Sequence, residues 1–153
     1  MKPLPHRYNV TITSGETTNP MITSDRLEPF TSAPPADFDG PGNLWSPETL
    51  LVAAVADCFA LTFRAIAKSS HLRWSKLLCD ADGILDRSEG VTRFTAIDLH
   101  VWLVVPAETD TARARAVLEK AEKNCLVGNS LRFAPALHMN VSVEEPVMLP
   151  TAV

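Results

Sequence analysis

The feature that most constrains this chain is an apolar segment that runs from Leu50 to Ala67 and is interrupted only by Asp57, Thr62 and Arg64. A helix that is apolar on nearly every face has no side to present to water, so the segment predicts a helix buried all round. The alternative is a membrane span, which needs about 20 mainly apolar residues. Asp57 and Arg64 would then lie in hydrocarbon, where charge is costly, so a core helix is favoured and no membrane partner is expected.

Three signals mark the start of this helix. Ser46 offers an N-cap hydroxyl, Pro47 suits the first helical position, and Glu48 places an acid in the first turn, where the helix dipole favours it. We expect the helix to begin there and to run to about Ser69.

The segments before the helix predict a hairpin and a loop. Residues 7–13 alternate apolar and polar side chains up to a Ser14-Gly15 turn, which indicates a half-buried strand, and Met21 to Ser24 would form the return strand. The segment from Pro29 to Gly42 is so rich in proline and glycine that it predicts a long loop without helix or sheet.

The segments after the helix predict strands around a second helix. Residues 74–86 and 93–105 indicate two strands joined by a turn at 88–90. Thr109 or Asp110 would cap a helix that ends at Cys125, with Gly128 as its stop. The second strand alternates most clearly and should turn one set of residues inward and the other outward: Ile97, Leu99, Val101, Leu103 and Val105 against Asp98, His100 and Trp102.

A last strand would turn Leu137, Met139, Val141 and Val143 inward. The element order is therefore strands, helix, strands, helix, strand, which is an α+β fold without internal repeats. The length of 153 residues and the 46% hydrophobic content suit one domain over residues 1–153.

The net charge and the N-terminal residues restrict which partners and which cellular location are expected. The net charge of -4 and the pI near 5.5 leave no basic surface for nucleic acid, so a small neutral or apolar ligand fits better. Residues 1–12 contain prolines at positions 3 and 5 and no continuous apolar stretch, so they do not read as a secretory signal, and a cytoplasmic location is expected.

The three cysteines would be thiols in such a compartment, and any disulfide would be transient. The sequence has no C-x-x-C pair and its four histidines are scattered singly, so neither a metal nor another cofactor is expected. His100 and His138, on outward faces of strands, are expected to be solvated.

The positions of Cys58 and Cys125 along their predicted helices indicate different roles for the two residues. A cysteine attacks peroxides as the thiolate, whose formation a nearby cation or helix N-terminus favours. Cys58 lies in mid-helix, where the dipole contributes little, so an arginine from elsewhere would have to activate it. Cys125 lies in the last helical turn, where the negative helix end should raise its pKa. This favours Cys58 as the attacking residue and Cys125 as the resolving residue.

Buried structural thiols are the competing interpretation, because free cysteine is among the most buried residue types. Cys79, in the apolar run from Leu77, is assigned to that structural role. From spacing alone, the same interpretation is favoured for Cys58 and Cys125.

A resemblance changes this balance. The segment SPETLLVAAVADC (residues 46–58), followed by AEKNC (121–125) and NSL (129–131), resembles the osmotically inducible protein C and organic hydroperoxide resistance family along nearly the whole chain. The resemblance implies one OsmC-like α+β domain, an intertwined homodimer, and a peroxiredoxin-like enzyme that reduces organic hydroperoxides. Cys58 would be the peroxidatic residue and Cys125 the resolving one, and a lipoyl-type dithiol would reduce their disulfide. The alternative is a dimeric binding or structural protein of this fold without the activity.

The resemblance also implies that Glu48 holds an activating arginine. The family places this arginine in the N-terminal hairpin or the following loop, where the sequence offers Arg7 and Arg26, and we select Arg26. Asp57 departs from the pattern, since a carboxylate beside the nucleophile opposes thiolate formation.

Helix geometry supports the dimer. Glu48 and Cys58 are ten residues apart, about 15 Å along one helix, and so cannot touch within one chain's helix. Two copies crossing antiparallel near Ala53 and Ala54 would bring Glu48 of one level with Cys58 of the other. Trp45 and Phe59 are candidates to line an apolar substrate pocket.

Overall fold

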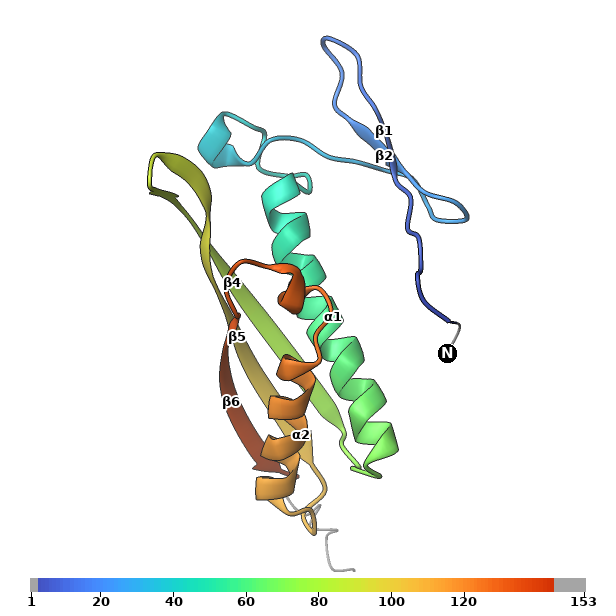
Figure 1. Cartoon of the computed structure of the whole chain (residues 1–153), viewed down its shortest axis with the longest axis vertical. Helices are drawn as coiled ribbons and strands as arrows, with labels where there is room; N and C mark the ends of the chain where they lie inside the picture. Colours follow the sequence, from blue (N-terminus) through green and yellow to red (C-terminus); the bar gives the residue numbers. More distant parts are fainter. Residues whose placement is uncertain (1–2, 145–153) are drawn as a thin grey trace, which may run out of the picture. The chain divides into compact units, whose positions relative to one another are not determined.

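The computed structural model describes residues 3–144, which divide between two compact units, the first ending at Leu51 and the second beginning at Val52. The elements follow the expected α+β order (Figure 1). That the chain acts as one domain stays a prediction.

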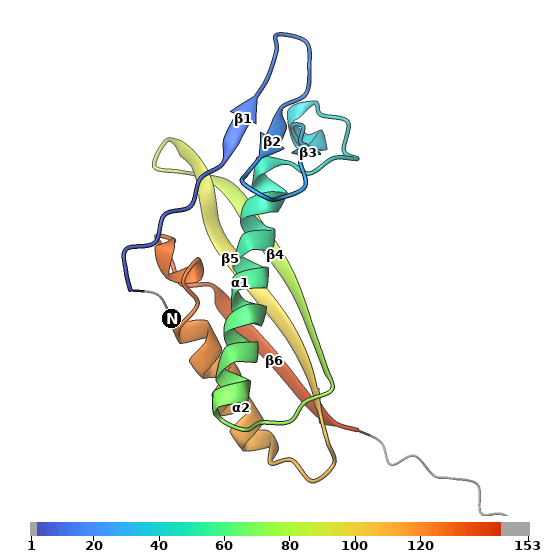
Figure 2. The same cartoon turned by 90° about the vertical axis from the view of Figure 1, so that its right-hand side faces the viewer.

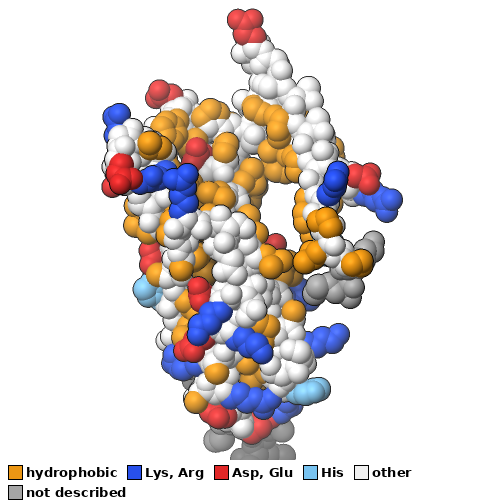
Figure 3. Space-filling model, in the orientation of Figure 1, with side chains coloured by type: hydrophobic (Ala, Val, Ile, Leu, Met, Phe, Trp, Pro, Cys, Tyr) orange, Lys and Arg blue, Asp and Glu red, His pale blue; other side chains and the backbone are white. Residues whose placement is uncertain are grey.

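The first unit contains a small antiparallel sheet of β1 (Thr11–Thr13), β2 (Met21–Thr23) and β3 (Phe30–Thr31). The predicted hairpin is confirmed, with Ile12 opposite Ile22. Its strands are shorter than expected, and their apolar face is open in the single chain, with Tyr8 90% exposed. The predicted half-burial is therefore wrong here, since residues 7–13 are all exposed, and hydrophobic side chains lie open on the surface of this unit (Figure 3).

The proline-rich segment is more ordered than predicted. Phe30 and Thr31 extend the sheet as β3, and residues Ala36–Phe38 form the short 3₁₀ helix η1. Gly40 closes this turn by donating its N–H to the Pro35 carbonyl at 3.0 Å. The expectation that the whole stretch lacks helix and sheet is therefore wrong.

The central helix α1 spans Pro47–Ser69, as predicted. Ser46 caps it, because its hydroxyl accepts the Thr49 N–H at 3.2 Å while the Thr49 hydroxyl accepts the Ser46 N–H at 2.9 Å. Burial differs from the expectation: one stripe with a spacing of four is buried, and Leu61 on another face is 50% exposed. The buried stripe consists of Val55, Phe59, Phe63 and Ala67.

By length and composition alone, α1 could also cross a membrane, as the core helices of many water-soluble proteins could. Its charged residues Asp57 and Arg64 both lie on exposed positions. The absence of a membrane partner stays a prediction.

The second unit is a sheet covered on one face by helices. Strands β4 (Lys76–Ser88) and β5 (Val91–Val105) pair antiparallel, and β6 (Ala136–Val143) runs parallel to β5. Figures 1 and 2 show α1 and α2 (Thr111–Lys123) lying on the same face of this sheet. The predicted inward face of β5 is confirmed, since Ile97, Leu99, Val101, Leu103 and Val105 are all buried.

Two boundary predictions need correction. Asp110 caps α2 by accepting the Ala112 N–H at 2.9 Å, but the helix ends at Lys123 and Cys125 follows it. Gly128 belongs to a second 3₁₀ helix, η2 (Gly128–Ser130), and does not stop α2. In β6 the inward set is half-buried except for Val143, which is exposed at the end of the strand.

Candidate active site

The site is built where α1 meets the segment that follows α2. Cys58 is half-buried beside the buried stripe of α1. Its sulfur accepts a hydrogen bond from the Val127 N–H at 3.4 Å, across 69 positions of sequence. Asp57, the preceding residue, is exposed, which agrees with the expected turn of about 100° between neighbouring helical residues.

Cys125 is 3% exposed and lies in the core of the second unit. Its thiol contacts the Val55 carbonyl at 3.9 Å, and its sulfur accepts the Gly128 N–H at 3.4 Å. Because Val127 and Gly128 are consecutive and donate to Cys58 Sγ and Cys125 Sγ respectively, the two thiols are neighbours. The structure thus brings together the two cysteines that the sequence singled out.

Burial raises the pKa of Cys125, and the neighbouring Cys58 side chain raises it further, while the N–H groups of Gly128 and Val127 lower it. The direction of this shift is the one expected from sequence. The cause is different: the expectation invoked the negative end of a helix, whereas desolvation dominates because Cys125 lies past the helix in the core. A protonated Cys125 beside Cys58 suits a resolving thiol, since the less ionised of two thiols is the weaker nucleophile toward peroxide.

Cys79 is the third thiol of this region. It lies on β4 opposite Val101, on the face of the sheet that the helices cover. Burial raises the pKa of Cys79 from 9.0 to about 11, with smaller contributions from Asp80 and Cys125. Such a thiol stays protonated and unreactive at neutral pH, which agrees with its expected structural role.

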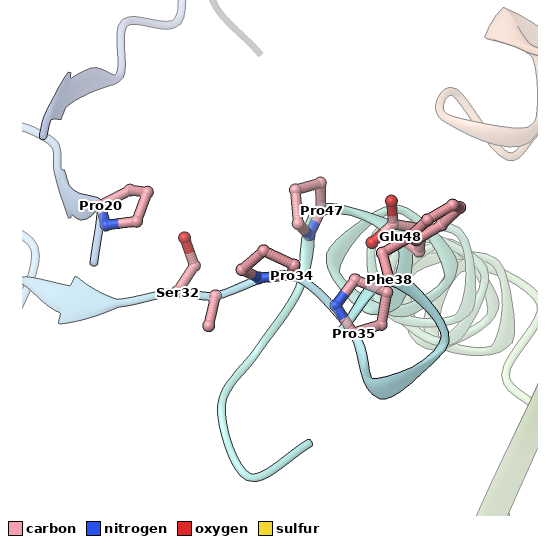
Figure 4. A pocket seen from close by; sticks show the side chains of 8 residues that line it. Pro20, Ser32, Pro34, Pro35, Phe38, Pro47 and Glu48 are labelled. Atoms are coloured by element: carbon pink, nitrogen blue, oxygen red, sulfur yellow. The ribbon is translucent and has the colours of Figure 1, made fainter. Parts of the chain in front are cut away.

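Glu48 lies in the first turn of α1 and lines a cavity of about 300 Å³ within the first unit (Figure 4). Proline rings and the Phe38 side chain form most of the other walls. Glu48 Oε2 is buried and has no hydrogen-bond partner among residues 3–144. A buried carboxylate oxygen without a donor is costly, so this position suits a cationic group supplied from outside the unit.

The structure does not bring an arginine to Cys58. Arg26 is 90% exposed and pairs with Asp25 at 3.4 Å, and Arg7 is also exposed. Within the described part of the chain, no arginine donates a hydrogen bond to Cys58 Sγ. That Arg26 activates Cys58 stays a prediction.

The two pocket candidates occupy different environments. Phe59 is fully buried in the core of the second unit, whereas Trp45 is half-exposed in the first, where its carbonyl accepts the Ala33 N–H at 3.0 Å. Neither lines the cavity beside Glu48. Their role in a substrate pocket stays a prediction.

Val127 and Gly128 are functional candidates that sequence reasoning missed. Backbone N–H groups carry no residue signature, so only the position of Gly128 three residues after a candidate cysteine could have suggested a close approach. A Cβ at Gly128 would lie 3.3 Å from Cys125 Sγ, so this glycine permits the contact with the sulfur.

His100 and His138 were expected to be solvated, but both rings make contacts with other side chains. The His100 and His138 rings stack at 4.7 Å, His138 Nε2 lies 2.8 Å from Asp98 Oδ1, and His100 Nε2 lies 3.8 Å from Asp82 Oδ2. The parallel register of β5 and β6 places the two rings side by side. Among the described residues, no group of three or more His, Cys, Asp or Glu side chains is arranged to hold a metal ion.

These features define an α+β protein with two neighbouring thiols between its central helix and the segment after its second helix. The sequence profile of the OsmC-like proteins matches residues 40–140, so the chain belongs to the OsmC-like family. The chain is 29% identical over 114 residues to the uncharacterized protein YmaD of Bacillus subtilis, covering 72% of this chain and 75% of that protein.

Solved structures share the fold. An OsmC-like protein from Mycoplasma pneumoniae has a TM-score of 0.75 and 20% identity, covering 93% of this chain and 100% of that one. An OsmC-like protein of unknown function from Vibrio cholerae has a TM-score of 0.77 and 17% identity, covering 90% and 99%. An organic hydroperoxide resistance protein from Elizabethkingia anophelis has a TM-score of 0.71 and 23% identity, covering 95% and 99%. At these identities the likeness establishes the fold alone.

Proposed function

We propose that this protein is a thiol-dependent peroxidase that reduces organic hydroperoxides, with Cys58 attacking and Cys125 resolving. The observation that carries the proposal is that the consecutive residues Val127 and Gly128 donate their N–H groups to Cys58 Sγ and Cys125 Sγ, each at 3.4 Å, so the two sulfurs are neighbours. Membership of the OsmC-like family supports it, as does the name of the Elizabethkingia relative, an organic hydroperoxide resistance protein.

The reaction proceeds in two steps. The Cys58 thiolate attacks one oxygen of the hydroperoxide, the O–O bond breaks, and the alkoxide leaves and takes up a proton, which yields an alcohol and a Cys58 sulfenic acid. The Cys125 thiol then condenses with the sulfenic acid, which forms the Cys58–Cys125 disulfide and releases water. A dithiol of the lipoyl type restores both thiols by exchange and is itself oxidised to a disulfide.

A homodimer completes the site in this proposal. The exposed side chain of Leu61 on α1 and the open apolar face of β1 favour a second copy as their cover. An antiparallel crossing of two α1 helices brings Glu48 of one copy level with Cys58 of the other. The buried oxygen of Glu48 then accepts a hydrogen bond from an arginine, Arg26 or Arg7, whose charge favours the Cys58 thiolate.

The substrate contacts, the cellular location and the partners are also part of the proposal. The substrate lies against Trp45 and Phe59, and the enzyme works in the cytoplasm, where dithiol reductants are present. Neither nucleic acid nor membrane is a partner.

The test is a titration with one equivalent of cumene hydroperoxide, followed by free-thiol counting and mass spectrometry. We expect the wild type to lose two thiols through a Cys58–Cys125 disulfide. The Cys58→Ser variant should not consume peroxide, and Cys125→Ser should turn over once and then over-oxidise at Cys58. Cys79→Ser is the matched control and should behave as the wild type. An unmodified Cys58 in the wild type would instead favour the binding or structural alternative.

A further inference from the structure

The segment after α2 directs backbone N–H groups at both sulfurs of the site. Val127 donates to Cys58 Sγ and Gly128 donates to Cys125 Sγ, each at 3.4 Å. The Val127 N–H lies close enough to Cys125 to lower the pKa of that thiol as well. One short turn of backbone therefore donates hydrogen bonds to two cysteines that come from different parts of the fold.

This turn is held by its own hydrogen bonds. The Cys125 carbonyl accepts the Asn129 N–H at 2.9 Å, and the Leu126 carbonyl accepts the Ser130 hydroxyl at 2.9 Å. The Asn129 side chain ties the turn to α2 by donating to the Lys123 carbonyl at 3.1 Å. The N–H groups are thus oriented before any reaction, and no rearrangement is needed to bring them to the sulfurs.

The Cys58 sulfur accepts the Val127 N–H, and no lysine or arginine of residues 3–144 donates a hydrogen bond to it. A hydrogen bond from an N–H group to an anionic acceptor is stronger than one to a neutral acceptor, so the bond from Val127 strengthens as negative charge develops on the sulfur. Mid-helix placement gives Cys58 little help from the dipole of α1. The Val127 N–H is therefore a fixed hydrogen-bond donor to the Cys58 sulfur.

We propose that the Val127 N–H is a catalytic group that stabilises the negative charge on the Cys58 sulfur when it attacks the substrate. This inference rests on the proposed peroxidase function. In the attack, the hydrogen bond holds the electron pair of the sulfur as an anion until the S–O bond forms.

The test removes the N–H without removing the fold. Val127 has φ -71°, which proline can adopt, so Val127→Pro deletes the donor with little strain at residue 127. Val127→Ala is the matched control, because it shortens the side chain and keeps the N–H. An ester bond at residue 127 deletes only the N–H and serves if the proline variant does not fold. Ligation at Cys125 provides this variant from a 1–124 thioester and a 125–153 peptide without a further substitution.

The readout is the rate at which iodoacetamide alkylates Cys58 in the reduced full-length protein, followed by peptide mass spectrometry. We expect the proline or ester variant to react about fivefold to tenfold more slowly at neutral pH, because the attacking sulfur has lost one hydrogen-bond donor. The alanine variant should stay within about twofold of the wild type. Equal rates in all variants, or an equal loss in Val127→Ala, would overturn the proposal.

Hydroperoxide consumption by the same samples separates this inference from the proposed function. If the wild type consumes hydroperoxide and the proline or ester variant consumes it equally fast, the catalytic role of Val127 is wrong and the peroxidase proposal stands. If the wild type consumes none, the peroxidase proposal is wrong, whatever the alkylation rates show about the thiolate.

Discussion

Gly40 offers the sharpest test of the loop that frames Glu48. A Cβ added at Gly40 would lie 1.7 Å from the Pro34 carbonyl oxygen, 2.4 Å from the carbonyl carbon and 2.9 Å from the Pro35 oxygen. All three are backbone atoms, so no rotamer change relieves the clash. Because the backbone of the turn must open, Gly40→Ala should lower the free energy of unfolding by about 3 kcal/mol, at the upper end for overpacking.

Gly42→Ala is the matched control, since it makes the same substitution in the same loop for a different physical reason. A Cβ there meets only the Ala36 Cβ at an ordinary 3.5 Å, but φ is +71°. The left-handed conformation should cost about 1 kcal/mol for alanine. Gly40→Ala should therefore be the more destabilising variant by about 2 kcal/mol.

Urea unfolding gives the global free energy, and hydrogen exchange of the Phe38, Asp39 and Gly40 amides reports the turn itself. These amides donate to the Pro35 and Ala36 carbonyls, so they should exchange faster in Gly40→Ala. The reasoning is refuted if Gly40→Ala is as stable as Gly42→Ala and its three amides stay protected.

Two further predictions concern the thiols. The unfolded Cys79 thiol ionises near its ordinary pKa of 9.0, whereas the folded thiol keeps its proton up to about 11, so stability falls as pH rises through that window. Between about pH 8 and about pH 10.5, the free energy of unfolding in urea should fall by about 1 kcal/mol more in the wild type than in Cys79→Ala, after allowance for partial solvation. An equal fall in both proteins would contradict this prediction. Gly128→Ala keeps the backbone N–H, but its Cβ would lie 3.3 Å from Cys125 Sγ, so closure of the disulfide should slow about fivefold. Dimedone should then trap more Cys58 sulfenic acid than in the wild type. The same amount of trapped sulfenic acid in both proteins would refute the prediction.

Local signals allowed much of the fold to be predicted from the sequence. The cap at Ser46 and the proline at position 47 located the start of α1, because capping depends on neighbouring residues only. The alternation in β5 identified its buried face for the same reason, since it repeats every two residues. Where a signal weakened, as at the end of α2, the predicted boundary was wrong by two residues.

Burial of α1 could not be predicted from composition. An apolar residue such as Leu61 has the same sequence signature as Val55, but only Val55 faces the sheet. Which stripe of a uniformly apolar helix is covered depends on the partners that fold against it. In this chain the sheet and α2 cover one stripe, and the rest is left for the proposed second copy.

The sequence by itself determined the elements, their order and the identity of the candidate thiols, because capping, periodicity and cysteine identity are properties of short segments. Only the tertiary structure brought Cys125 to Cys58 and turned the Val127 N–H toward the Cys58 sulfur across 69 positions. It likewise left one Glu48 oxygen buried without a donor among the described residues. These contacts depend on how the chain folds back on itself, and a backbone N–H is the same in every residue except proline, so no local pattern encodes where it points.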